Sequence, residues 1–96
     1  MGTTEAIEGM INELWYHYDI RNDVLYVRRG AATDATTYGE ESDDGFIVLR
    51  RGADDLVVGM TVVKWWKRFG QGALPDSLLE ITRRVETTTR QLPIAA

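Results

Sequence analysis

Apolar residues are most concentrated between Asp44 and Val63. Two apolar runs, Phe46–Arg50 and Leu56–Val63, flank a short connection that contains glycine and aspartate. A connection of this length and composition is typical of a β-hairpin. No other segment is apolar on both faces, so we expect residues 44–63 to form a hairpin in the centre of a sheet.

A second hairpin is predicted over residues 14–29. Aromatic residues in 14–18 favour a strand, residues 19–23 have turn chemistry, and 24–28 form another apolar run. The alternation of a strand places Leu14, Tyr16 and Tyr18 on one face, with Trp15 and His17 on the other.

Helical spacing occurs near both ends of the chain. In the first segment, apolar residues at i, i+3, i+4 and i+7 predict a short helix over residues 3–13; they are Ile7, Met10, Ile11 and Leu14. In the last segment, Ser77 and Glu80 have the spacing of a capping box. A helix is therefore predicted over residues 75–92, with a buried stripe formed by Leu78, Ile81 and Val85.

Two segments connect these elements. Residues 30–43 are small, polar and acidic, and form either a loop or an edge strand around residues 36–38. Residues 64–74 form an aromatic connector. We expect one α+β domain over residues 1–96: an antiparallel meander of three to five strands, a C-terminal helix on one face and a short N-terminal helix.

Composition narrows the class of protein. A chain of 96 residues with 44% hydrophobic and 27% charged residues is typical of one soluble domain. No cysteine is present, so no disulfide framework or thiolate metal site is expected. The apolar stretches are shorter than the roughly 20 residues of a membrane span, and the N-terminus lacks the pattern of a secretory signal. We expect a cytoplasmic protein with no membrane partner.

Charge is distributed unevenly around a net value of −4. Residues 1–55 contain 12 acidic and 5 basic residues, a net charge of −7, whereas residues 56–96 contain 3 and 6, a net charge of +3. The acidic total argues against general nucleic-acid binding. The asymmetry fits internal salt bridges, head-to-tail association, or separate surfaces for separate partners.

The stretch Tyr18–Arg28, YDIRNDVLYVR, resembles the opening of the small bacterial family called domain of unknown function 2283. The similarity covers roughly residues 15–63, including DGFIV at 44–48 and LVVGM at 56–60. The chain departs from the family pattern at Arg50-Arg51-Gly52 and outside this range. The resemblance implies no established activity. It implies a binding role, because members are suspected of forming paired modules like toxin–antitoxin systems.

Candidate chemistry is sparse. His17 is the one histidine, and neither Ser42 nor Ser77 lies in a nucleophile-elbow motif. The carboxylates cluster before and within the predicted central hairpin: Glu40, Glu41, Asp43, Asp44, Asp54 and Asp55. Their spacing does not match a calcium loop. We expect no catalytic, cofactor or metal site, and interpret these acids as a surface for a basic partner. A metal-dependent or acid/base hydrolase that uses them with His17 is the alternative.

The segment Lys64–Phe69, KWWKRF, is the most unusual. If it is extended, Trp65 and Trp66 face opposite sides, so one packs in the core and the other needs a different cover. The candidate interface residues are therefore Lys64, Trp65, Trp66, Arg68 and Phe69. Nucleic-acid binding through Lys64, Trp65, Lys67 and Arg68 is a further alternative.

These patterns predict a non-catalytic interaction protein with an antitoxin-like role. A small sheet with one helix leaves one face under-covered, so we also expect a homodimer.

Overall fold

The computed structural model describes residues 6–29, 37–41, 46–52 and 56–92. It is an α+β structure: the described residues form six strands of one antiparallel sheet, a one-turn helix and a C-terminal helix. The elements are β1 (Ala6–Ile11), β2 (Leu14–Asp19), β3 (Val24–Arg29), β4 (Thr37–Glu41), β5 (Phe46–Arg51), β6 (Val57–Val63), α1 (Trp65–Phe69) and α2 (Leu78–Gln91).

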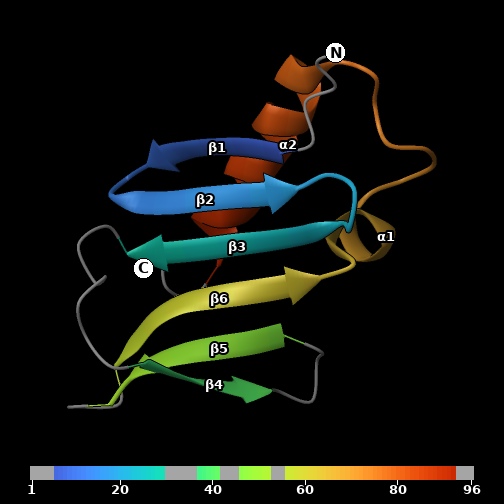
Figure 1. Cartoon of the computed structure of the whole chain (residues 1–96). Helices are drawn as coiled ribbons and strands as arrows, with labels where there is room; N and C mark the ends of the chain where they lie inside the picture. Colours follow the sequence, from blue (N-terminus) through green and yellow to red (C-terminus); the bar gives the residue numbers. More distant parts are fainter. Residues whose placement is uncertain (1–5, 30–36, 42–45, 53–55, 93–96) are drawn as a thin grey trace.

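The strand order is β1-β2-β3-β6-β5-β4, with every neighbouring pair antiparallel. Two three-stranded meanders are thus joined through β3 and β6 (Figure 1). The predicted central hairpin is present as β5 and β6, although β5 lies one strand from the edge. Of the two alternatives for residues 30–43, a loop or an edge strand, the described part has the strand, because residues 37–41 form β4 at the sheet edge. The sheet has more strands than the three to five expected.

The predicted N-terminal helix is wrong for the described residues, because residues 6–11 form β1; residues 3–5 lie outside the described part. Ile7 faces the core, whereas Met10 is 58% exposed. A helix of about ten residues is not stable by itself in water. As a strand, residues 6–11 instead form backbone hydrogen bonds with β2. Gly9 permits this pairing: a Cβ there would lie 2.6 Å from the Tyr16 hydroxyl oxygen.

The hairpin predicted over residues 14–29 is confirmed as β2 and β3. Its alternation is also confirmed, because Leu14, Tyr16 and Tyr18 are buried while Trp15 and His17 are only partly covered. Leu25 and Val27 of β3 continue the buried face. This face forms the core together with β6, Trp65 and α2.

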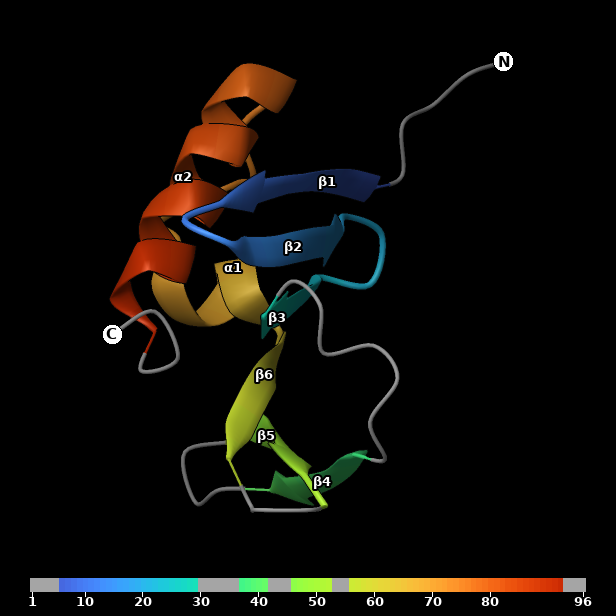
Figure 2. The same ribbon diagram turned by 90° about the vertical axis from the view of Figure 1, so that its left-hand side faces the viewer.

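Helix α2 begins after Ser77, whose Oγ accepts a hydrogen bond from the Glu80 N–H at 3.3 Å. The predicted cap is therefore present. The buried stripe of α2 consists of Ile81, Val85 and Thr89, each four residues after the last. Leu78, which was predicted to belong to this stripe, is instead 46% exposed. The helix packs mainly on β1 and β2 and does not extend over β5 and β4 (Figure 2).

Candidate interaction groove

Asp23, in the turn between β2 and β3, fixes the start of α1. Its Oδ1 accepts hydrogen bonds from the Tyr18 hydroxyl and the Trp66 N–H, both at 2.7 Å. Its Oδ2 accepts a bond from the Lys67 N–H at 3.2 Å, and its carbonyl oxygen accepts one from the Trp65 N–H at 3.0 Å. Burial, together with the bond to the Asp23 carboxylate, raises the pKa of Tyr18. The carboxylate thus supplies acceptors for first-turn N–H groups that a helix cannot satisfy itself.

The segment is not extended at Trp65 and Trp66, because these residues form α1. Lys64 has left-handed angles, φ 58° and ψ 46°, and turns the chain out of β6 into the helix. Adjacent residues on a helix are about 100° apart rather than opposite each other as on a strand. Both indoles can therefore lie on the same side of the sheet, and their centroids are 5.7 Å apart.

Trp65 belongs to the core and is 1% exposed. Its ring packs edge-on against Tyr18, with centroids 4.7 Å apart. Its indole N–H donates to the Thr88 Oγ1 at 3.1 Å, which ties α1 to α2. Trp65 therefore cannot serve as a surface anchor or stack on a nucleobase, contrary to the sequence-based interpretation.

Trp66 is only partly buried and forms part of a wall. Its indole N–H donates to the Gly72 carbonyl oxygen at 2.9 Å. A Cβ at Gly70 would overlap the indole ring, so the loop after α1 packs closely on this tryptophan. The loop fixes the ring in one position, and this constraint leaves less conformational entropy to lose on binding.

A groove of about 640 Å³ opens between the uncovered half of the sheet and the two helices. We call it the β5–α2 groove. Its wall on the sheet side is Phe46 and Val48 of β5 with Met60 of β6. The helical wall and floor are Trp65, Trp66, Phe69, Arg84, Thr87, Thr88, Gln91 and Leu92. The α2 residues from Arg84 to Gln91 have the i, i+3, i+4, i+7 spacing of one helix face.

The groove is apolar with one cation, Arg84, among its described lining residues. The Arg84 guanidinium lies over the Trp66 ring, 5.7 Å from its centroid, and Arg68 lies over Phe46 at 5.5 Å. Phe46 also stacks on Phe69, with centroids 6.1 Å apart. No side chain that lines the groove among the described residues is a carboxylate. The described lining of the groove therefore carries a single positive charge, in a chain that is acidic overall.

A second contact places α2 beside β2. The Tyr16 hydroxyl donates to the Glu86 Oε2 at 2.9 Å. Burial, and then the bond to this carboxylate, raises the pKa of Tyr16 to about 12. With the Trp65–Thr88 bond, this contact sets the position of α2 and hence the width of the groove.

Of the other predicted interface residues, only Phe69 lines the groove. Phe69 is 52% exposed and lines it, Arg68 lies over Phe46, and Lys64 is exposed in the turn before α1. Of the predicted acidic surface, Glu40 and Glu41 are exposed on β4, and Glu40 Oε1 lies 3.0 Å from Arg50 Nε. Asp43, Asp44, Asp54 and Asp55 lie outside the described residues.

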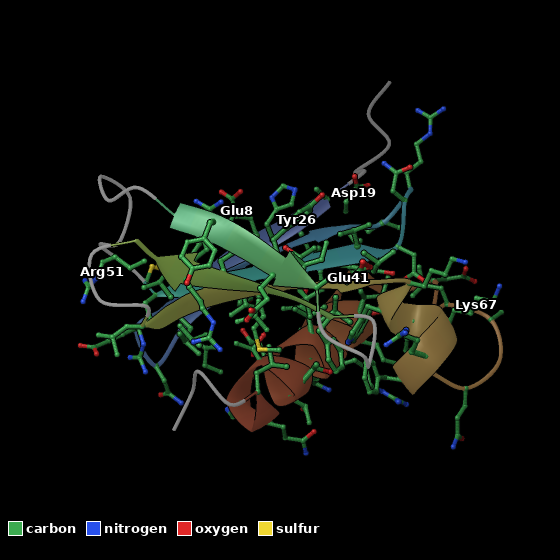
Figure 3. All side chains as sticks on the ribbon, turned by 90° about the horizontal axis from the view of Figure 1, so that it is seen from below. Glu8, Asp19, Tyr26, Glu41, Arg51 and Lys67 are labelled. Atoms are coloured by element: carbon green, nitrogen blue, oxygen red, sulfur yellow. The ribbon has the colours of Figure 1, made fainter. Side chains whose placement is uncertain are left out.

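His17 pairs with Glu8 of β1 and Tyr26 of β3. Glu8 and Tyr26 lie on the face of the sheet opposite α2 (Figure 3). The His17 Nδ1 is 3.0 Å from the Glu8 Oε1, and the His17 ring stacks on Trp15 at 5.7 Å. The described partner of His17 is thus Glu8, not one of the loop carboxylates of the hydrolase hypothesis. Within the described ranges, no group of three histidine or acidic residues could hold a metal ion.

Most residues of the groove were not predicted from the sequence. Phe46, Val48 and Met60 were interpreted only as strand residues, and Arg84 was not among the candidate site residues. The signal that pointed to the groove is the KWWKRF segment, since Trp66 and Phe69 both line it. The polar run after Val85 is a second sequence feature that indicates the groove. Thr87 and Gln91 stand at positions where a fully buried helix face would carry aliphatic residues.

No family model, curated protein or solved structure matches this chain. The resemblance to the domain 2283 family therefore stays a prediction. Neither α1 nor α2 is long and apolar enough to cross a membrane.

Proposed function

We propose that this chain is a non-catalytic protein-interaction module whose binding site is the β5–α2 groove. The observation that carries the proposal is the apolar wall that α2 leaves uncovered. Phe69 is 52% exposed, and Phe46, Val48 and Trp66 are only partly buried. Water contact with such a continuous aromatic surface is unfavourable, and a partner segment would remove it.

Residue types and size support the same role. Tryptophan, phenylalanine, methionine and arginine are enriched at the centres of protein interfaces, and all four line this groove. Its volume of about 640 Å³ fits one or two large side chains of a partner. Trp66, fixed by the loop at Gly70 and Gly72, is the proposed anchor.

A random peptide library displayed on phage, selected on the immobilised protein, tests the proposal. Thr87→Trp fills the groove from an exposed helix position without removing a core side chain. Leu79→Trp is the matched control, because Leu79 is 61% exposed on the same helix and does not line the groove. We expect selected peptides to bind the wild type and Leu79→Trp but not Thr87→Trp. Failure to enrich peptides, or equal binding to Thr87→Trp, would count against the groove.

The homodimer and the antitoxin-like role stay proposals from the sequence. Support for a dimer comes from the sheet face opposite α2, which carries Met10 at 58% exposure and Tyr26 at 37%. This face also carries both Glu8 and Arg28, charges of opposite sign that a twofold axis could pair. Light scattering at micromolar concentration tests this, and a monomeric mass would contradict it.

A further inference from the structure

We propose that the partner segment which enters the β5–α2 groove is an acidic peptide: a large apolar side chain next to a carboxylate that Arg84 binds. The inference rests on the proposed function and adds the chemistry of the partner. It reverses the sign expected from the sequence, in which the acids of this chain were to bind a basic partner.

The position of Arg84 carries the charge argument. Its guanidinium lies over the Trp66 ring at 5.7 Å, in the wall of the groove. Within the part of the chain that the structure describes, no carboxylate forms an ion pair with Arg84. An aromatic ring holds a guanidinium by its face, while the N–H donors lie in the guanidinium plane and remain suited to bind a carboxylate. Arg84 is thus held in place for an anion.

The surroundings of Arg84 favour the same sign. Of the described residues that line the groove, Arg84 is the one charged residue. Glu80, one turn before Arg84 on α2, and Glu86, two residues after it, do not line the groove, and the Glu86 Oε2 accepts its bond from Tyr16 on β2. One cation and no described carboxylate at an apolar groove favour acidic segments over basic ones.

A peptide fits the shape of this site. The α2 wall repeats along one helix face from Arg84 to Gln91, and β5 forms the facing wall. Such a groove can accommodate an extended or helical segment along its length. Gln91 offers an amide that can both donate to and accept from a peptide backbone.

The test uses a peptide selected on the wild type and a matched version in which each Asp or Glu is replaced by Asn or Gln. Calorimetry measures the affinity of both for the wild type, Arg84→Gln and the control Arg83→Gln. Arg83 is also exposed on α2 but does not line the groove. We expect the acidic peptide to bind the wild type about five- to tenfold more tightly than the amide version. Arg84→Gln removes this difference, and Arg83→Gln keeps it.

The outcomes separate the two proposals. Selected peptides that bind in the groove but are neutral or basic, or that bind equally well as amides, overturn the acidic partner and leave the groove intact. If no selected peptide needs the groove, so that all of them bind Thr87→Trp as well as the wild type, the proposed function is overturned as well. If the protein self-associates and Thr87→Trp dissociates it, the occupant is a second copy of this chain, and the acidic peptide is contradicted.

Discussion

The two halves of the sheet differ in how they are covered. Strands β2 and β3 bury Leu14, Tyr16, Tyr18, Leu25 and Val27 to 3% exposure or less beneath α2 and α1. Strand β5 carries an equally apolar run, yet each of its residues remains partly exposed. Apolar sequence alone therefore does not determine burial. The placement of α2 over β1 and β2 determines it. We call β1, β2 and β3 the covered half of the sheet, and we call the side of β5, beside the groove, the open half.

The neighbours Trp65 and Trp66 lie on either side of this division. Trp65 connects Tyr18 to Thr88 in the covered half, while Trp66 faces the groove. We expect Trp65→Ala to lower the free energy of unfolding by about 3–5 kcal/mol, because it removes a fully buried ring. Phe69→Ala, in the open half, should cost about 1 kcal/mol, the value of one exposed ring pair. Denaturant titration of both variants measures the difference, and equal losses would contradict the division.

Asp23 links the halves by holding α1 against the β2–β3 turn. Asp23→Asn keeps the shape of the side chain and its tolerance of the left-handed backbone, φ 56°. It removes one acceptor and the charge, so we expect a loss of about 1–2 kcal/mol. Asp19→Asn is the control, since the described hydrogen bonds of the Asp19 side chain stay within its own turn, to Asn22 and the Arg21 backbone. A loss as large for Asp19→Asn would show that α1 does not depend on Asp23.

The covered half should lose stability at high pH. The folded pKa of Tyr16 is raised to about 12 from an ordinary value near 10. Below about pH 10 the hydroxyl is protonated in both states and its full contribution is present. Between about pH 10 and 12 the unfolded state ionises first, so stability falls. Tyr16→Phe should lose about 1 kcal/mol near neutral pH and show a shallower alkaline decline. An unchanged alkaline slope in denaturant titrations across this range would contradict the Tyr16–Glu86 contact.

Gly70 tests the wall of the open half. Its φ of −89° suits any residue, so Gly70→Ala acts through the overlap of the new methyl group with the Trp66 ring. Gly72→Ala meets nothing within 4 Å but has φ of +72°, which costs about 1 kcal/mol. We expect both variants to lose similar stability, while only Gly70→Ala weakens peptide binding by displacing Trp66. Calorimetry with the selected peptide measures this, and equal affinities would place binding elsewhere.

The smallest expected effect is a gain, in the β1–β2 turn. Asn12 and Glu13 both have positive φ, 50° and 68°, as in the two-residue turns that favour Asn-Gly. Glu13→Gly should therefore stabilise the protein by about 0.5–1 kcal/mol, because the strain of a left-handed glutamate is relieved. Asn12→Gly is the comparison, and we expect a smaller gain because asparagine already tolerates this conformation. The midpoint of thermal unfolding measures both.

Local patterns predicted the elements whose interactions are close in sequence. The β2–β3 hairpin, the β5–β6 hairpin and the Ser77 cap all follow from alternation, turn residues and capping chemistry. Segment 6–11 was misassigned because Ile7 and Ile11, four residues apart, fit both periods, whereas Met10 fits only the helical one and is exposed in β1. The helical conformation of Trp65 and Trp66 could not be predicted for a similar reason. It depends on Asp23, 43 residues before Trp66, whose carboxylate starts a helix where the chain could have continued as a strand.

We propose that partners bind beside Trp66 in the open half. The chain contains three tryptophans, so an isotope-labelled sample gives three indole N–H signals by NMR. They report on the opposite sheet face (Trp15), the core (Trp65) and the groove (Trp66). On addition of the selected acidic peptide we expect the Trp66 signal to shift most, with Trp15 unchanged. A shift of Trp15 with Trp66 unchanged would contradict the account and place the partner on the other face of the sheet.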